Sequence, residues 1–392
     1  MNEVVILSAV RTPIGKMGRS LSSLSSVDLG TLAAKKAIEQ AHIAPEIISQ
    51  AIVGNVLQAG VGQNVARQIA LKSGLSETST AMTINQVCGS GLKAIRLGQS
   101  AIMLGDAEAV LVGGTESMTN VPHLVPNMRQ GKPYGSTTML DGLEHDGLLD
   151  AFSHKPMGIT AENVAHKYHV TREAQDALAL RSHQRAVKAT ESGAFNDEIV
   201  PVTITLKKGT TTITRDEPIR PDTSMAALAG LKPAFVPNGM VTAGNAAGLN
   251  DGASMLVLMS KARAEQANIP YLAVLDTYQE AGIDPNYMGY APFYAVNQLL
   301  AKQQMSIDDI DRFEINEAFA AQTVAVMRDL QIPDDKVNVN GGAIALGHPV
   351  GASGARIVTT LVHDLKRENL KTGIATLCVG GGMGVALSLH LE

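Results

Sequence analysis

The chain contains 392 residues, of which 45% are hydrophobic and 18% are charged, and its formal net charge is −5. This length and composition exclude a disordered chain and predict a folded protein of two or three packed units. The negative charge argues against nucleic acid as the main partner, because phosphate binding needs a basic surface. The scarcity of aromatic residues, at 3%, argues against a stacking surface for single strands.

Two cysteines, Cys88 and Cys378, are too few for a disulfide framework in so long a chain, and they suit a reducing compartment. The first residues do not form a signal peptide, and no apolar run approaches the roughly 20 residues that a membrane helix needs. The last three residues form no peroxisomal or reticulum address. We therefore expect a cytoplasmic protein with no membrane partner.

Strand-like and helix-like segments alternate at the start of the chain. The apolar run at residues 4–9 predicts a buried strand, and similar runs follow at residues 51–56 and 109–114. Between them, residues 27–42 and 91–104 carry apolar side chains at steps of three and four, which is the spacing of a helix. This alternation with short connections predicts a mixed sheet covered by helices.

The middle of the chain, residues 119–249, departs from this alternation and is richer in Pro, His and charged residues. It contains a long predicted helix at residues 171–192, with Thr171 as its N-cap, and a predicted hairpin around residues 207–209. We interpret the segment as an insertion, and insertions into a rigid scaffold often form ligand-binding lids.

The strand and helix pattern recurs in the second part of the chain. Segments at residues 4–9, 51–56, 90–94 and 109–114 resemble later segments in the same order, at residues 272–275, 313–318, 353–357 and 376–381. Ser90 and Ser353 are 263 residues apart, and Gly114 and Gly381 are 267 apart. We predict an α/β fold of two similar mixed-sheet halves in layers. The N-terminal half would be residues 1–118, returning at about 250–270, with an inserted loop domain at 119–249 and a C-terminal half at 271–392.

Cys88 lies at the turn between an apolar run and the predicted helix at residues 91–104. A cysteine in this place is at the N-terminus of the helix, where the helix dipole favours the thiolate. The neighbouring Gly89 and Gly91 allow a tight turn and a close approach of the backbone to a ligand. A buried structural cysteine is the alternative interpretation.

His348 lies in a glycine-dense loop at residues 341–354 and is followed by Pro349. Imidazole titrates near neutral pH, so it suits a base that takes a proton from a thiol. A structural role is the alternative for any one of the ten histidines of the chain.

Cys378 ends an apolar run and precedes three glycines, the first of which is Gly380. The backbone N–H groups of such a run can face an oxyanion. A phosphate cradle is a competing interpretation, but the Lys and Ser/Thr that end a P-loop are missing. Residues 60–65 match a dinucleotide fingerprint only in part, because Val65 stands in place of its third glycine.

His166 and His169 lie three residues apart on a predicted helix, and such a pair could bind a metal ion. A solvated helix face is the favoured interpretation, and we predict no metal site.

Four segments of the chain resemble the active-site loops of the thiolase family, and the similarity extends over essentially the whole chain. The segments are residues 85–91 (Asn-Gln-Val-Cys-Gly-Ser-Gly), 316–319 (Asn-Glu-Ala-Phe), 340–354 (through Gly-His-Pro) and 378–382 (Cys-Val-Gly-Gly-Gly). Residues 5–15 resemble the first strand of the family, and residues 157–163 and 242–252 resemble its short-chain branch. The resemblance implies a duplicated thiolase-type fold and acetyl-CoA C-acetyltransferase activity.

The resemblance also implies a ping-pong reaction that condenses two acetyl-CoA molecules to acetoacetyl-CoA and CoA, and its reverse. Cys88 would be the nucleophile, deprotonated by His348, and would carry the acetyl group as a thioester. Cys378 would remove a proton from the second acetyl-CoA. Asn316, through a water molecule, and His348 would form one oxyanion hole, and the N–H groups of Cys88 and Gly380 would form the other.

By the same resemblance the insertion would bind CoA, which is a substrate, so no separate cofactor is expected. The residues implied in substrate or CoA binding are Leu148, Met157, Arg220, Ala243, Leu249, Ala318 and Phe319. Leu148, Met157, Ala318 and Phe319 would line the acyl pocket, and Arg220 would lie near the nucleotide end of CoA. The chain departs from the family pattern at Ala247, which is usually Ser, and at Pro156, which is often His in the short-chain branch. The family also implies a homotetramer, a dimer of dimers.

Three other functions stay open. A degradative 3-ketoacyl-CoA thiolase has the same catalytic residues and a roomier pocket, although the segment at Met157 favours the short-chain form. A ketoacyl synthase also uses a cysteine on a duplicated α/β fold, but it leaves Cys378 without a role. A non-catalytic module that binds CoA or lipid predicts the loss of one or more of the four catalytic residues, and all four are present: Cys88, His348, Asn316 and Cys378.

Overall fold

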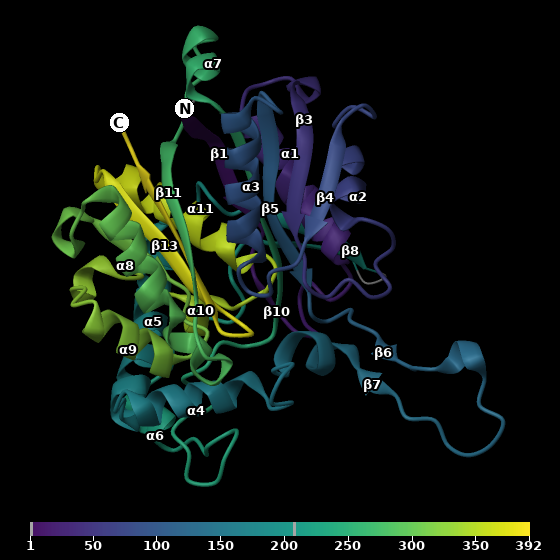
Figure 1. Cartoon of the computed structure of the whole chain (residues 1–392), viewed down its shortest axis with the longest axis vertical. Helices are drawn as coiled ribbons and strands as arrows, with labels where there is room; N and C mark the ends of the chain where they lie inside the picture. The colour runs from purple at the N-terminus through teal and green to yellow at the C-terminus, as the bar shows by residue number, and fades with distance from the viewer. Residues whose placement is uncertain (1–2, 207–208) are drawn as a thin grey trace.

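A large mixed sheet runs through the molecule in the computed structural model, which describes residues 3–206 and 209–392 (Figure 1). Its strand order is β12-β13-β14-β11-β1-β10-β5-β3-β4, and the short β2 pairs with β10. The strands of the N-terminal half are β1 (Val4–Arg11), β2 (Gly15–Lys16), β3 (Ile48–Gly54), β4 (Thr80–Ile84), β5 (Ala109–Ser117) and β10 (Asn250–Ser260). Those of the C-terminal half are β11 (Ala273–Gly282), β12 (Arg312–Ile315), β13 (Thr372–Val379) and β14 (Met383–His390).

The two halves repeat one arrangement. Strands β1, β10, β5 and β3 follow the same order as β11, β14, β13 and β12, and β3–β5 and β12–β13 are parallel pairs. Helices α1 (Ser26–Gln40) and α3 (Ser90–Leu104) of the first half correspond to α8 (Ala291–Gln303) and α11 (Ser353–Glu368) of the second. The half-sheets are joined where the start of β1 pairs with β11. The predicted duplicated α/β fold is therefore confirmed.

Helices form three layers around the two half-sheets (Figure 1). Helices α1 and α2 (Val65–Lys72) cover the outer face of the N-terminal half, and α8 and α9 (Ala320–Asp329) cover the outer face of the C-terminal half. Helices α3 and α11 fill the space between the half-sheets, where apolar side chains from both halves form one core. Burial of this apolar surface, at about 25 cal/mol per Å², is the main force that holds the halves together.

The first turns of α3 and α11 touch each other through glycine. A Cβ atom on Gly354 would lie 2.3 Å from Leu92 N, and a Cβ atom on Gly91 would lie 2.7 Å from Ala355 N. Both distances are too short for a side chain, so the two helix starts approach this closely only because these positions lack one. The loops that precede the two helices therefore meet at one place.

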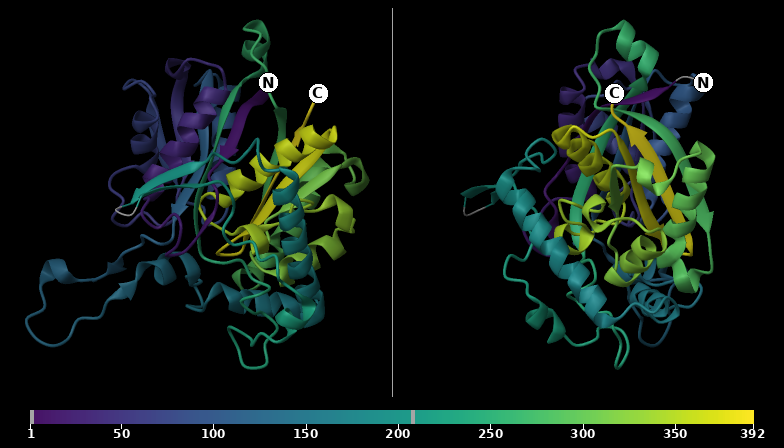
Figure 2. Two further views of the ribbon diagram at one scale, coloured as in Figure 1. Left: turned by 180° about the vertical axis from the view of Figure 1, so that it is seen from behind. Right: turned by 90° about the vertical axis from the view of Figure 1, so that its left-hand side faces the viewer.

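The segment between β5 and β10 carries most of the molecule outside the two halves. Its elements are β6 (His123–Leu124), β7 (Leu140–Asp141), a π-helical turn (Glu144–Leu148), α4 (Met157–Lys167), α5 (Arg172–Ser192), β8 (Val202–Leu206), β9 (Gly209–Ile213) and α6 (Met225–Ala229). The arm with β6 and β7 projects from the body (Figure 1 and Figure 2). Thr171 caps α5 as predicted, since its side chain accepts a hydrogen bond from Ala174 N.

Two details of this segment bear on the sequence predictions. Strands β8 and β9 pair antiparallel, as expected for a hairpin, but Lys207 and Lys208 of the predicted turn lie outside the described residues. The prediction that His166 and His169 share a helix is wrong. Helix α4 ends at Lys167, and His169 lies beyond it with a φ of +53°, because the chain turns toward α5 there.

The remaining helical segments are short and connect the larger elements: Pro45–Ile47, Met128–Gln130, α7 (Lys261–Gln266), Pro285–Tyr290, Ile307–Asp309, Asp334–Lys336 and α10 (Ala343–Leu346). Among the residues described, no helix combines the length and the apolar character that crossing a membrane requires.

Candidate active site

The loop between β4 and α3 presents Cys88 on a constrained turn. Val87, just before it, has a φ of +45°, which is rare for a β-branched residue. The turn is held by Ser90, whose hydroxyl donates to Val87 O at 2.7 Å and accepts from Gln86 N at 2.8 Å. Asn85 Oδ1 also accepts from Val87 N at 2.9 Å. Several hydrogen bonds thus hold a strained backbone, as is common where a reactive side chain must point in one direction.

The thiol of Cys88 is neutral in this environment. Burial raises its pKa to about 11, although the N–H groups of Gly380 and of Cys88 itself lower it; the charge of Glu116 raises it further. That the start of α3 favours a thiolate stays a prediction, and desolvation of the thiol acts against it. A base must remove the proton when Cys88 attacks.

His348 lies in the loop between α10 and α11 and is held by its neighbours. Its backbone N donates to Asn250 Oδ1 at 2.9 Å, and its ring Nδ1 lies 2.5 Å from Ser353 Oγ. The Ser353 hydroxyl can donate its single hydrogen to Pro349 O, at 2.9 Å, and accept from Nδ1–H, while Asn316 Nδ2, a donor, faces Nε2 and disfavours a proton there. We therefore assign the tautomer with the proton on Nδ1, which leaves Nε2 free to accept a proton.

The imidazole of His348 is also kept neutral. Burial and the nearby charge of Arg356 lower its pKa to about 4. A neutral imidazole beside a neutral thiol is the starting state for a general base that takes the thiol proton as a bond forms.

Asn316 follows β12 and lies beside His348. Its Nδ2 is 3.5 Å from His348 Nε2, and its backbone N donates to Thr376 O of the neighbouring strand at 3.0 Å. The side-chain oxygen Oδ1 is buried and accepts no hydrogen bond from any residue in the described parts of the chain. This oxygen can accept from a water molecule or from a ligand, which fits the expected role of Asn316.

Cys378 lies near the end of β13, buried against Met288 and Ala318. Burial raises the pKa of its thiol far above the usual range, and Cys88, in its thiolate form, would raise that pKa further, so the two cysteines lie within electrostatic reach of each other. Cys88 and Cys378 are 290 residues apart in the chain but lie near each other. Cys88 precedes α3 and Cys378 lies near the end of β13, and both elements meet at the junction of the halves.

Glu116 links the loops of both halves, a role that the sequence did not reveal. Its carboxylate accepts from the backbone N of Val56, Leu57 and Gly351 and from Asn55 Nδ2, at 2.7–3.1 Å. Burial raises its pKa to about 7, while these four donors lower it. The carboxylate thereby ties the loop after β3 to the loop that carries His348.

An apolar cavity of about 70 Å³ opens onto Cys88 and His348. The predicted acyl-pocket residues all line it: Leu148, Met157, Ala318 and Phe319. Leu249 lines it too. The two other predicted contacts do not, because Ala243 and Arg220 are exposed elsewhere, the latter beside His183 of α5.

Sequence reasoning missed several lining residues, among them Val87, Met118, Met288 and Val350. Val350 could have been found from the duplication, because it lies 263 residues after Val87, as Ser353 does after Ser90. Met118 and Met288 carried no signal, since they reach the cavity only through the tertiary fold.

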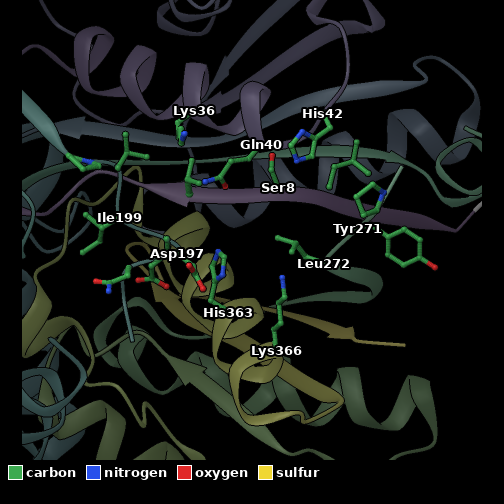
Figure 3. A pocket seen from close by; sticks show the side chains of 17 residues that line it. Ser8, Lys36, Gln40, His42, Asp197, Ile199, Tyr271, Leu272, His363 and Lys366 are labelled. Carbon is green, nitrogen blue, oxygen red and sulfur yellow. The ribbon is translucent and has the colours of Figure 1, made fainter. Parts of the chain in front are cut away.

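A larger cavity, of about 580 Å³, lies elsewhere (Figure 3). Polar side chains such as Lys36, His42, His363 and Lys366 line it, and neither cysteine does. His363 lies ten residues along α11 from Ser353, which is roughly 15 Å. The two cavities share no lining residue, and the smaller one is the one lined by Cys88 and His348.

Comparison with known proteins agrees with this geometry. Family models described as "Thiolase, N-terminal domain" and "Thiolase, C-terminal domain" match residues 4–262 and 269–391. The chain belongs to the thiolase family. It is an acyltransferase, as its relatives are.

Individual relatives of this thiolase cover it from end to end. It is 50% identical over 391 residues, 100% of both chains, to an acetyl-CoA acetyltransferase of Cupriavidus necator. It is 49% identical over 98% of both chains to a probable acetyl-CoA acyltransferase of Staphylococcus aureus. Two solved structures superpose with a TM-score of 0.97, each covering 100% of this chain and 99% of its own. One is the Bacillus anthracis acetyl-CoA acetyltransferase, at 44% identity, and the other is human mitochondrial 3-ketoacyl-CoA thiolase, at 41%.

Proposed function

We propose that this thiolase is an acetyl-CoA C-acetyltransferase, which reversibly joins two molecules of acetyl-CoA to give acetoacetyl-CoA and CoA. The observation that carries the proposal is a small apolar cavity lined by the thiol of Cys88 and the imidazole of His348, with the thiol of Cys378 packed behind its wall against Met288 and Ala318. A carbon–carbon bond between two acyl groups needs a nucleophile to hold the first and a base to activate the second. Two cysteines meet these two needs.

In the first half-reaction Cys88 Sγ attacks the carbonyl carbon of acetyl-CoA while His348 Nε2 takes the thiol proton. The N–H groups of Cys88 and Gly380 lower the pKa of the reacting thiol, which supports the proposal that they donate to the oxyanion formed next to it. The C–S bond to CoA breaks, and the CoA sulfur takes the proton of the Cys378 thiol. The products are an acetyl thioester on Cys88, free CoA, a protonated His348 and a Cys378 thiolate.

In the second half-reaction the Cys378 thiolate takes a proton from the methyl group of a second acetyl-CoA. The electron pair moves toward the thioester oxygen, where the protonated His348 and a water held by Asn316 stabilise the enolate. The enolate carbon attacks the acetyl carbonyl, the bond to Cys88 breaks, and His348 returns its proton to Cys88. Every proton is accounted for, and acetoacetyl-CoA leaves.

The size of the cavity favours short acyl groups. A volume of about 70 Å³ has room for a short acyl group, and the bulky side chains of Met157, Met288 and Phe319 line it. A degradative 3-ketoacyl-CoA thiolase for longer chains is the second candidate, because one of the similar structures bears that name. Rates of thiolysis on C4 and on C8–C16 3-ketoacyl-CoA substrates separate the two, and the first candidate predicts a steep fall beyond C4.

We further propose that CoA lies along the insertion, with its pantetheine past Leu249 and its nucleotide end toward Arg220. Leu249 lines the cavity, and Arg220 is exposed. Ala247 also lines the cavity and offers no hydroxyl to the pantetheine. One missing hydrogen bond of about 1 kcal/mol weakens CoA binding without stopping the chemistry.

We also propose a homotetramer that works in the cytoplasm, where both thiols stay reduced. The edge strand β4 exposes 47% of Met82, and the projecting arm exposes Met128, Tyr134 and Met139. Such apolar side chains on an edge strand and on an arm suit contacts with further copies of the chain. Light scattering coupled to gel filtration measures the mass, and a monomer at micromolar concentration would contradict the proposal.

The chemistry is tested by incubation with isotopically labelled acetyl-CoA, followed by mass spectrometry of the Cys88 peptide. An acetyl adduct on Cys88 is expected, and its absence from folded protein would favour a non-catalytic binding module. Exchange of the acetyl-CoA methyl protons with deuterium oxide tests the base. Cys378→Ala should still form the adduct but should lose the exchange, and exchange at the normal rate would remove Cys378 from the mechanism.

A further inference from the structure

The side chain of Gln322 lies against the sulfur of Cys378. Gln322 is in the first turn of α9 and is fully buried. The nearer atom of its amide is 3.2 Å from Cys378 Sγ. A buried amide with defined neighbours on both sides is a strong constraint on whatever it touches.

The hydrogen-bond partners decide which way the amide points. The far atom of the amide faces two donors of Thr323, the backbone N at 2.9 Å and Oγ1 at 2.8 Å. The near atom faces Asn316 O, an acceptor, at 3.3 Å. In the opposite orientation the thiol of Cys378 would donate to Oε1, but Oε1 would also face the acceptor Asn316 O and the NH₂ group would face the donor Thr323 N. We therefore assign the oxygen toward Thr323 and the NH₂ group toward Asn316 and Cys378.

We propose that Gln322 is a positioning residue for Cys378, whose NH₂ group donates one hydrogen to the sulfur and the other to the main-chain oxygen of Asn316. This proposal rests on the proposed function, in which Cys378 is a thiolate between the two half-reactions. In the free enzyme the backbone N–H of Cys378 lowers the pKa of its thiol, and the titratable side chain that acts on it within the described residues is Cys88, which raises that pKa. An N–H donor at the sulfur favours the charged form.

The packing around Gln322 fixes its position. A Cβ atom on Gly289 would lie 2.7 Å from Gln322 Cβ, so the glycine leaves the room that the glutamine stem fills. Met288, next to Gly289, lines the cavity and packs against Cys378. Gln322 therefore connects the base, the loop that carries Asn316 and one wall of the cavity.

The test replaces Gln322 with Met, which has a similar shape and no donor. The pH dependence of alkylation by iodoacetamide is measured separately on the Cys378 and Cys88 peptides by mass spectrometry. The pKa of Cys378 lies above the pH range of the assay, so a rise of one pH unit, about the worth of a hydrogen bond to a charged group, should appear as a roughly tenfold fall in the alkylation rate of Cys378 at each pH. That of Cys88 should stay unchanged. Exchange of the acetyl-CoA methyl protons should slow about tenfold at neutral pH.

Gln175→Met is the matched control, because Gln175 is equally buried in a helix and does not line the cavity. It should leave both profiles unchanged. An unmoved Cys378 profile in Gln322→Met, or an equal shift of both thiols, would overturn the proposal. If Gln322→Met does not fold, Gln322→Leu also removes the donor without adding a charge and must show the same fall in the alkylation rate of Cys378. Alkylation needs no acetyl-CoA, so this result stands apart from the exchange experiment that tests Cys378 as the base.

Discussion

The starts of α3 and α11 are the same piece of structure put to different uses. Ser90 and Ser353, 263 residues apart, each donate their hydroxyl hydrogen to a carbonyl in the loop before the helix, Val87 O at 2.7 Å and Pro349 O at 2.9 Å. The two hydroxyl oxygens accept hydrogen bonds from different donors. Ser90 accepts a hydrogen bond from the backbone N of Gln86, which closes the Cys88 turn, whereas Ser353 accepts one from the imidazole Nδ1 of His348.

The position of the nucleophile shows how the halves have diverged. The residue that corresponds to Cys88 in the second half is Gly351, again 263 positions later. A Cβ atom on Gly351 would lie 2.7 Å from Glu116 Oε2, the carboxylate that ties the two halves together. The second half therefore has no room for a side chain where the first half holds its thiol. The first turns of α3 and α11 are therefore alike, and the two halves differ in the loops before these helices, where one has a cysteine and the other a glycine.

The largest effect should come from the half that holds the nucleophile. Cys88→Ser should lower the rate of acyl-enzyme formation at least about a thousandfold, because a serine hydroxyl is a much weaker nucleophile at the same place. Mass spectrometry after a timed pulse of labelled acetyl-CoA measures it. Cys378→Ala serves as the control and should still give the Cys88 adduct. A normal rate of acylation in Cys88→Ser would show that another residue is the nucleophile.

The contact between the two helix starts should be the next most sensitive feature. Gly354→Ala and Gly91→Ala each force a methyl group against backbone atoms of the other helix, and each should lower the free energy of unfolding by about 3 kcal/mol. Gly354→Ala should be the worse of the two, since its contact is shorter. Urea unfolding followed by circular dichroism measures both. Gly282→Ala, where a Cβ would meet no atom within 4 Å, should change stability by less than about 0.5 kcal/mol.

Acid should destabilise the protein through the buried histidines. The pKa of His348 is lowered to about 4 in the folded state and is about 6.5 in the unfolded chain. Between these values the unfolded state binds a proton that the folded state does not, so stability falls as pH drops from about 6.5 to about 4, by up to about 3 kcal/mol. His348→Gln should remove this part of the slope in urea unfolding at a series of pH values.

His183 of α5 is the comparison for that experiment, because burial also lowers its pKa to about 4 and it does not line the cavity. His183→Gln should flatten the same part of the slope and leave acylation of Cys88 intact. His348→Gln should flatten the slope and lose acylation. Equal slopes in the wild type and both variants would show that neither histidine is held neutral.

Much of the scaffold could be predicted from the sequence, because the signals were local. Three- and four-residue spacing of apolar residues marks α1 and α3, Thr171 marks the start of α5, and the repeated Ser-Gly pairs mark the duplication. The raised pKa of Cys88 could not be predicted, because desolvation by the surrounding loops of both halves causes it. Met288 and Gln322 reach the site from segments that no motif connects with it.

The serine at the start of α11 contacts a catalytic side chain, because Ser353 accepts the Nδ1–H of His348, whereas Ser90 at the start of α3 bonds only to the backbone. Ser353→Ala removes the acceptor for Nδ1–H, so the proton is no longer held away from Nε2. Acyl-enzyme formation should slow between about tenfold and a hundredfold, the usual cost of losing a partner that orients a functional histidine. Rapid-quench acylation at saturating acetyl-CoA measures the rate. An unchanged rate would mean that Asn316 or the backbone alone orients the ring.

The smallest effect should come from the equivalent serine of the first half. Ser90→Ala removes the hydroxyl that closes the Cys88 turn, so Gln86 N and Val87 O lose a partner and Val87 is less firmly held at its positive φ. The free energy of unfolding should fall by about 1 kcal/mol, and acylation should slow by less than about threefold, because no proton moves through Ser90. Urea unfolding and rapid-quench acylation of the two serine variants, measured side by side, test the difference. If Ser90→Ala slowed acylation as much as Ser353→Ala, both serines would act only by holding the backbone. The proposed difference, in which Ser353 orients His348 and Ser90 holds the Cys88 turn, would then be wrong.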